Sequence, residues 1–320
     1  MNKKTLKNSI LLIITAAIWG FAFVAQSVGG DAIGPFAFNF VRFVIGAIVL
    51  IPVILIKDGI TENRDKPKNA KEYKTLLIGG LFCGIALCIA SNFQQLGINL
   101  GTTPGKAGFL TSCYILIVPI LSIFFKKRCP WTVWVGVVIT IAGLFLLCIN
   151  PSEGFHVKNS DLIVLLCAFC FSVQIMIIDK YSPLVDGVRL SCIQFAVAGI
   201  LSAVPTFIFD MELDIKNINV LINSITQKET LITVLYAGVM SCGVAYTLQI
   251  IAQNGLNPTI ACLLMSLESV FSVVGGWIIL NQSLGLREII GCCLVFSAIC
   301  LAQIDFSSLR TKNKTDKYNH

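Results

Sequence analysis

The chain has 320 residues, of which 56% are hydrophobic and only 13% charged, and its mean hydropathy is +0.83. This composition excludes an ordinary soluble domain and predicts a membrane protein. The formal net charge of +7 does not indicate nucleic-acid binding, because the Lys and Arg residues lie between apolar segments, where they orient a membrane protein.

Ten apolar segments reach or approach the roughly 20 residues that a helix needs to cross a bilayer. We therefore expect an all-α polytopic membrane protein with ten transmembrane helices. Their expected positions are 8–28, 33–56, 75–97, 104–125, 131–149, 161–179, 187–209, 230–252, 258–279 and 285–304. The first segment is long, lacks a small-residue cleavage site and is followed at once by the second, so we interpret it as a retained helix and not a signal peptide.

The distribution of basic residues predicts the orientation. If the N-terminus is cytoplasmic, the inner segments carry 18 of the 24 Lys and Arg residues and the outer segments carry five, while Arg42 lies within a span. Cytoplasmic loops of membrane proteins carry an excess of Lys and Arg. We therefore expect both termini in the cytoplasm and the protein in the plasma (inner) membrane of a bacterium.

The sequence also repeats itself. Shifted by 154 residues without a gap, it is identical at eleven of the 36 positions from 77 to 112. The matches include the pairs Gly84 and Gly238, Gln95 and Gln249, Gly101 and Gly255, and Pro104 and Pro258. The predicted organisation is a first repeat at 1–149, an outer linker at 150–160, a second repeat at 161–304 and a basic cytoplasmic tail at 305–320.

Five helices per repeat is an odd number, so the second repeat must enter the membrane from the opposite side. The two repeats are therefore predicted to be inverted. Inverted repeats make two arrangements, one open to each side of the membrane, similar in energy, and this is the structural basis of alternating access.

Several segments carry a family resemblance: AAIWGFAFVAQ (16–26), FNFVRF (38–43), YTLQIIAQNGLNPTIACLLMSLESVF (246–271) and IIGCCLVFSAICLAQ (289–303). Together with the helix count and the duplication, they resemble EamA-type ten-helix members of the drug/metabolite transporter superfamily. The resemblance implies a secondary transporter, often an exporter of amino acids or other small metabolites, with a central cavity between the halves. The chain departs from the family pattern at Lys127-Arg128 and Asn281-Gln282, where Gly-Glu is common, and at Ser269, where Pro is common.

Glu268 is the most informative polar residue, because it lies ten residues after Pro258, about 15 Å along a helix and near the middle of the bilayer. An ionisable residue at this depth is by default a functional candidate, here for substrate binding and proton coupling. The alternative is a structural carboxyl, paired with Arg42 or hydrogen-bonded to Ser266 or a neighbouring amide. Arg42 itself suits a counter-charge for Glu268 or for a substrate carboxylate, with snorkelling to an interface as the alternative.

Other side chains complete the candidate site. Trp19 and Phe23, one helical turn apart, suit an apolar substrate or an organic cation, with plain packing as the alternative. Polar side chains in the spans serve either as substrate ligands or as interhelical hydrogen bonds. The substrate-binding candidates are Trp19, Phe23, Arg42, Asn92, Tyr114, Gln174, Tyr246 and Glu268, and the gating candidates are Gln95, Gln249, Pro104 and Pro258.

An enzyme is not expected, because the only two histidines, His156 and His320, lie outside the predicted spans and no activated nucleophile emerges. No cofactor or metal is expected either, and GTTPGKAG (101–108) lacks the spacing of a phosphate-binding loop. We expect a proton-coupled secondary active transporter of a small metabolite such as an amino acid or amine, more in export than uptake. The alternatives are uptake of a choline-like quaternary amine and a non-transporting scaffold or lipid-binding protein. The expected partners are the metabolite, a proton and the bilayer, and a homodimer is left open.

Overall fold

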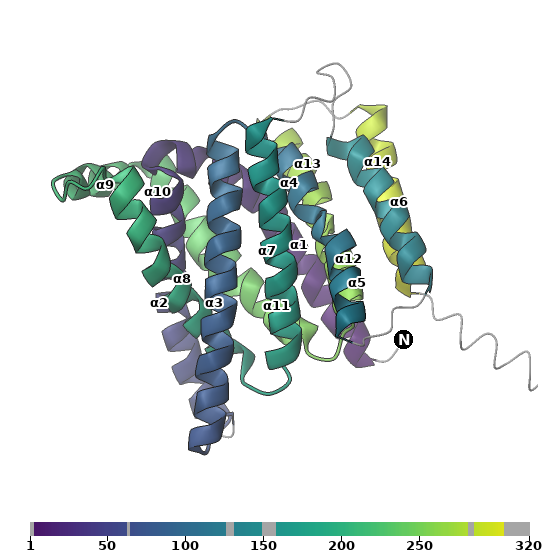
Figure 1. Ribbon diagram of the computed structural model, residues 1–320, viewed down its shortest axis with the longest axis horizontal. Helices are drawn as coiled ribbons and strands as arrows, with labels where there is room; N and C mark the ends of the chain where they lie inside the picture. Colours follow the sequence, from purple (N-terminus) through teal and green to yellow (C-terminus); the bar gives the residue numbers. More distant parts are fainter. Residues whose placement is uncertain (1–2, 63–64, 126–130, 149–157, 281–284, 304–320) are drawn as a thin grey trace, which may run out of the picture.

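A computed structural model describes residues 3–62, 65–125, 131–148, 158–280 and 285–303, and every element within these ranges is a helix (Figure 1). The elements are α1 (Lys3–Ile33), α2 (Pro35–Ile60), α3 (Ala70–Asn99), α4 (Pro104–Ser112), α5 (Tyr114–Phe124), α6 (Trp131–Cys148), α7 (Asn159–Tyr181), α8 (Gly187–Pro205), the π-helix η2 (Thr206–Asp210), α9 (Asn217–Thr226), α10 (Lys228–Leu235), the π-helix η3 (Tyr236–Tyr246), α11 (Thr247–Gln253), α12 (Pro258–Met265), α13 (Leu267–Leu280) and α14 (Leu286–Gln303).

Eight helical segments of the described chain are long and apolar enough to cross a membrane. They match eight of the ten predicted spans. The other two predictions, 131–149 and 285–304, correspond to α6 and α14, which have 18 residues each. The sequence did not predict α9, a ten-residue helix between α8 and α10. The basic tail and most of the linker lie outside the described residues.

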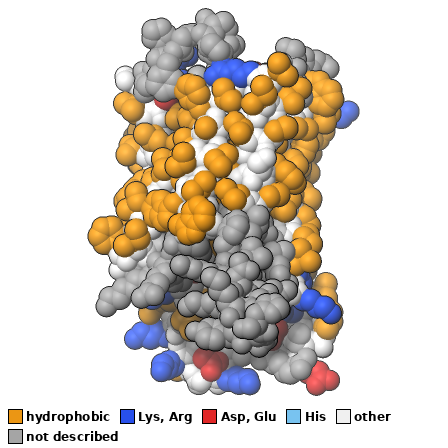
Figure 2. Space-filling model, turned by 90° about the vertical axis from the view of Figure 1, so that its right-hand side faces the viewer, with side chains coloured by type: hydrophobic (Ala, Val, Ile, Leu, Met, Phe, Trp, Pro, Cys, Tyr) orange, Lys and Arg blue, Asp and Glu red, His pale blue; other side chains and the backbone are white. Residues whose placement is uncertain are grey.

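The helices form one bundle whose outer surface is apolar. Figure 1 shows α6 and α14 side by side at one edge, and α9 and α10 at the other. Between them, α3 packs on α7 and α8, α2 packs on α8 and η3, and α1 packs on η3, α11 and α13. Figure 2 shows a belt of hydrophobic side chains on one face, with Lys and Arg gathered at its lower edge. Such a belt suits contact with lipid acyl chains.

Two of the spans are each interrupted between two consecutive α-helices, and they are built alike. The span from Pro104 to Phe124 is interrupted between α4 and α5, and the span from Pro258 is interrupted between α12 and α13. Both begin with proline at the first turn, where its missing N–H is not needed. Each proline lies three residues after a glycine with positive φ, which is +101° at Gly101 and +91° at Gly255. Only glycine adopts this left-handed conformation without strain.

One end of the bundle collects most of the described basic residues. The Asn8 side chain at the start of α1 donates to the Asn254 carbonyl (3.1 Å), and the Asn254 side chain donates to the Ser182 carbonyl (3.3 Å). This places the start of α1 and the α7–α8 and α11–α12 connections together. We call this the α1 end. Its described basic residues are Lys3, Lys4, Lys7, Lys57, Lys66, Lys68, Lys71, Lys74, Lys180 and Arg189.

Close helix contacts depend on glycine. A Cβ at Gly143 in α6 would lie 2.9 Å from the Gly291 carbonyl oxygen, and a Cβ at Gly291 in α14 would lie 2.6 Å from the Gly143 carbonyl oxygen. The two backbones therefore touch directly at this crossing. Small residues permit such approaches between helices in membranes, where apolar surfaces alone provide no driving force.

Candidate functional site

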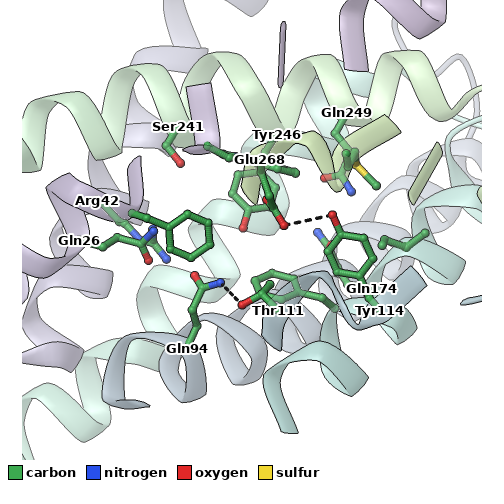
Figure 3. A pocket seen from close by; sticks show the side chains of 15 residues that line it. Gln26, Arg42, Gln94, Thr111, Tyr114, Gln174, Ser241, Tyr246, Gln249 and Glu268 are labelled. Atoms are coloured by element: carbon green, nitrogen blue, oxygen red, sulfur yellow. Dashed lines mark hydrogen bonds between the residues drawn. The ribbon is translucent and has the colours of Figure 1, made fainter. Parts of the chain in front are cut away.

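A small central cavity lies between the two halves of the chain (Figure 3). Its volume is about 30 Å³, enough for about two water molecules and too small for a metabolite. Both halves contribute side chains, the first from α1 to α5 and the second from α7, η3, α11, α12 and α13. The lining residues are Trp19, Phe23, Gln26, Arg42, Gln94, Thr111, Tyr114, Phe171, Gln174, Ile175, Ser241, Tyr246, Gln249, Met265 and Glu268.

Glu268 lies at the centre of the cavity, because the interruption between α12 and α13 places it there as the second residue of α13. The side chain is only 4% exposed. Its Oε1 accepts hydrogen bonds from the Tyr114 hydroxyl (3.1 Å) and the Ser112 hydroxyl (3.4 Å). The backbone is held as well, since a Cβ at Gly20 of α1 would lie 2.7 Å from the Glu268 carbonyl oxygen. The carboxyl group is therefore fixed in position and lies in the cavity.

Arg42 reaches the same cavity from α2 but does not pair with Glu268. The residue is 2% exposed, and its guanidinium carbon lies 5.0 Å from the Phe43 ring centroid and 5.8 Å from that of Phe38. Within the described chain, Nε and Nη2 of Arg42 have no hydrogen-bond partner. Of the alternatives that the sequence left open, snorkelling to an interface and an ion pair with Glu268 are both absent in this conformation.

Aromatic side chains form one wall of the cavity. The Trp19 and Tyr246 ring centroids lie 4.6 Å apart at an interplanar angle of 58°. Phe195 meets Tyr246 edge-on at 5.8 Å and stacks on Phe43 at 6.1 Å. Phe195 and Phe43 lie behind the lining residues, and this packing joins α1, α2, α8 and η3 across both halves. Trp19 Nε1 is buried without a hydrogen-bond partner in the described residues.

Amide side chains lie at both ends of the cavity. Figure 3 shows Gln26, Gln94 and Arg42 on one side of Glu268, and Gln174 and Gln249 on the other. Gln94 donates to the Thr111 hydroxyl (3.0 Å). The Oε1 atoms of Gln26, Gln174 and Gln249 have no donor among the described residues. Since buried polar atoms usually have partners, these atoms indicate a site that takes water or a polar ligand.

The structure brings seven of the eight predicted substrate-binding residues to the cavity, and only Asn92 lies elsewhere. Asn92 accepts from the Asn39 side chain (2.8 Å) and donates to the Ser202 hydroxyl (3.2 Å), so it joins α2, α3 and α8. This is the interhelical role that the sequence left as the alternative.

The predicted gating residues occupy different places. Gln95 donates to the Gln26 carbonyl (2.8 Å) near the end of α3, whereas Gln249 lines the cavity itself. Pro104 and Pro258 begin α4 and α12.

Sequence reasoning overlooked several cavity residues. Gln26 was detectable, because it follows Trp19 and Phe23 by seven and three residues and so shares their helix face. Gln94 was passed over in favour of its neighbour Gln95. Thr111 and Ser241 carried no recognisable signal, since Ser and Thr are common in membrane helices.

Residues 6–149 and residues 158–303 each match the EamA-like transporter family. The chain belongs to this family. The resemblance inferred from the sequence is therefore confirmed, and the protein is a multi-pass membrane transporter and not an enzyme.

Relatives of this EamA-like transporter are similar over nearly their whole length. An uncharacterized transporter of Archaeoglobus fulgidus is 28% identical over 94% of this chain and 87% of its own. The uncharacterized transporter YoaV of Bacillus subtilis is 22% identical over 92% of this chain and 96% of its own. A crystal structure aligns with a TM-score of 0.73 at 18% identity, covering 93% of this chain and 96% of that one, which shows a shared fold.

Two of the departures from the family pattern, Lys127-Arg128 and Asn281-Gln282, lie outside the described residues of this EamA-like transporter. The third, Ser269, lies beside the carboxyl group. Its hydroxyl lies 2.9 Å from that of Ser112, which in turn donates to Glu268. The serine thus joins the hydrogen-bonded group around the candidate site.

Proposed function

We propose that the protein is a secondary active transporter that binds a small zwitterionic metabolite, such as an amino acid, between Arg42 and Glu268. The guanidinium group of Arg42 takes the substrate carboxylate, and the carboxyl group of Glu268 takes its ammonium group. Trp19 and Tyr246 pack against the remainder of the substrate. Export is the direction that the family resemblance favours.

The observation that carries this proposal is the unpaired guanidinium group. A buried charge without a partner is costly, and in a membrane an ionisable residue is usually paired or functional. Arg42 and Glu268 line one cavity yet do not form an ion pair, and two guanidinium nitrogens have no partner among the described residues. A ligand with opposite charges at its two ends satisfies both groups. Arg presents a planar fork of donors suited to a carboxylate.

The construction of the bundle supports alternating access between inverted repeats with ten spans. The family match falls into two stretches, 6–149 and 158–303. Gly101 and Gly255 both have a positive φ, and α4–α5 and α12–α13 are interrupted within one residue of equivalent positions. We propose that the halves 1–149 and 161–304 rock against each other, flexing at Pro104 and Pro258, with Gln95 and Gln249 acting at opposite ends as gates. The small cavity suits an occluded intermediate of that cycle.

The proposal includes proton coupling and an orientation. Among the described residues, Glu268 is the only acidic side chain in the cavity lining, so a proton and the substrate ammonium group compete for it. Such competition couples the movement of one to the movement of the other. The basic residues gathered at the α1 end favour a cytoplasmic location for that end in a plasma membrane.

A choline-like quaternary amine is the second candidate substrate. The Trp19 and Tyr246 rings beside a carboxyl group suit an organic cation. Arg42 argues against this substrate. A cation without an anionic group leaves the guanidinium group unpaired, and the two positive charges repel each other. The two candidates therefore differ in their dependence on Arg42.

Counterflow in liposomes tests the proposal. Purified protein is reconstituted with labelled zwitterionic amino acids, primary amines and choline, each tested separately. We expect exchange of at least one amino acid, loss of that exchange in Arg42→Ala, and partial retention in Arg42→Lys. Choline exchange that survives Arg42→Ala would favour the cation transporter, and a lack of counterflow with every class would support a scaffold or lipid-binding protein.

A further inference from the structure

The hydrogen bond between Tyr114 and Glu268 joins equivalent positions of the two halves. The residues are 154 apart in the sequence, which is the shift that aligns the repeats. Tyr114 is the first residue of α5 and Glu268 the second residue of α13, so both lie within two residues after the interruption in their span. The phenol and the carboxyl group thus meet where the two interrupted spans approach each other (Figure 3).

The hydrogen bonds to Glu268 are asymmetric. Tyr114 and Ser112 both donate to Oε1, and Ser112 is in turn held by the Ser269 hydroxyl at 2.9 Å. No hydrogen bond to Oε2 is present among the described residues. All four side chains are buried. One carboxyl oxygen is therefore held by the protein, while the other is available to a ligand in the cavity.

Fixing Oε1 determines how the carboxyl group faces its ligand. The terminal torsion of a glutamate side chain is soft, so an unrestrained carboxyl group rotates and offers either oxygen. A phenol hydroxyl beside a carboxyl group can donate a hydrogen bond but carries no charge. Tyr114 therefore orients the carboxyl group of Glu268. Because it is uncharged, it does not replace the cationic group of the substrate as an ion-pair partner.

We propose that Tyr114 is the positioning residue of Glu268, and that the two form one unit shared by the repeats. Tyr114 holds Oε1, and Oε2 receives the cationic group of the substrate. The identity of that ligand rests on the proposed function, whereas the Tyr114–Glu268 unit does not. Because the positions are equivalent, the exchanged pair Tyr114→Glu with Glu268→Tyr places the carboxyl group at the same centre from the other half. Ser266, the repeat equivalent of Ser112, is then the neighbouring hydroxyl.

Infrared spectroscopy of the ligand-free protein tests the unit directly. The carboxyl stretching bands of Glu268 are identified by their loss in Glu268→Gln. We expect Tyr114→Phe to shift these bands, because Oε1 loses its stronger donor. Tyr236→Phe is the matched control, since the Tyr236 hydroxyl donates to the Ile18 carbonyl (2.9 Å) outside the cavity lining. Bands that are the same in Tyr114→Phe and Tyr236→Phe would overturn the proposal.

Binding of the amino acid that shows the strongest counterflow provides the second test. We expect Tyr114→Phe to weaken its affinity by about tenfold or more, as for a lost hydrogen bond to a charged group, and Tyr236→Phe to leave it unchanged. Glu268→Tyr alone should abolish binding, and the exchanged double variant should restore it to within about tenfold of Tyr114→Phe. If Tyr114→Phe binds like the native protein, the positioning role is wrong. If no amino acid binds the native protein, the proposed function fails, and the infrared comparison still decides the inference.

Discussion

Replacing Arg189 with Gln should open the bundle at the α1 end. Arg189, near the start of α8, forms ion pairs with Asp58 in α2 and with Asp186 (Nη1 to Oδ1, 3.5 Å). Lys57 pairs with Asp186 and with Asp65 (3.0 Å), and Lys66 pairs with Asp58 (3.3 Å). These contacts tie α2, from the first half, to α8, from the second.

The number of ion pairs lost sets the expected magnitude. The side chains of Arg189 and Asp58 are 10% and 9% exposed, but they lie at the polar α1 end of the bundle, where solvent screens part of their interaction. Arg189→Gln removes two ion pairs, while Asp58 keeps Lys66 and Asp186 keeps Lys57. We therefore expect a change of about tenfold in the folding equilibrium constant. Lys66→Gln is the matched control, because Lys66 is 45% exposed and forms one ion pair, so its loss should have a smaller effect.

Thermal unfolding and side-chain labelling together measure the effect. A single cysteine at Gln249, in a background without the 13 native cysteines, reports access to the cavity. We expect Arg189→Gln to lower the unfolding temperature and to speed labelling from the α1 end, and Lys66→Gln to do neither. Equal behaviour of the two variants would refute the reasoning. Lower stability with unchanged labelling would show that the ion pairs support the fold without closing that end.

Four further predictions follow from the sequence and the packing. Cysteines at Lys68 and Lys158, exposed at opposite ends, should label from the cytoplasm and from outside respectively, and labelling of both from one side would contradict the inverted arrangement. In Glu268→Gln, transport driven by a pH gradient should fail; flux with unchanged pH dependence would make the carboxyl group structural. Gly143→Ala should destabilise the α6–α14 contact by about 1–3 kcal/mol, measured by thermal unfolding against Gly59→Ala, whose Cβ meets no atom within 4 Å. A homodimer predicts twice the 34.8 kDa protein mass in light scattering after subtraction of detergent, and a mass of one chain would exclude it.

The sequence predicted much of the site because helix periodicity and membrane depth constrain it. Trp19 and Phe23 share a helix face, and the distance of Glu268 from Pro258 placed it near mid-membrane, so their convergence followed from geometry. Tertiary contacts decided the rest. Asn92 is a polar residue in a span like Gln174, and only the packing of α3 against α8 directs it away from the cavity. Whether Arg42 pairs with Glu268 depends on the positions of α2 and α13, which no local pattern encodes.

The π-helix η3 has a consequence for the proposed transport cycle. Its 11 residues, Tyr236–Tyr246, align without a gap to residues 82–92, which are wound as an ordinary α-helix within α3. The difference is therefore one of winding and not of an inserted residue. If the halves exchange conformations when the protein turns to face the other side, residues 82–92 should loosen into i→i+5 hydrogen bonding while η3 tightens. Ser241 and Tyr246 lie in η3 and line the cavity, so this rewinding would turn them relative to the substrate. Amide hydrogen exchange would then become faster in one of these two stretches when it becomes slower in the other. The ratio of the two exchange rates would report which way the transporter faces.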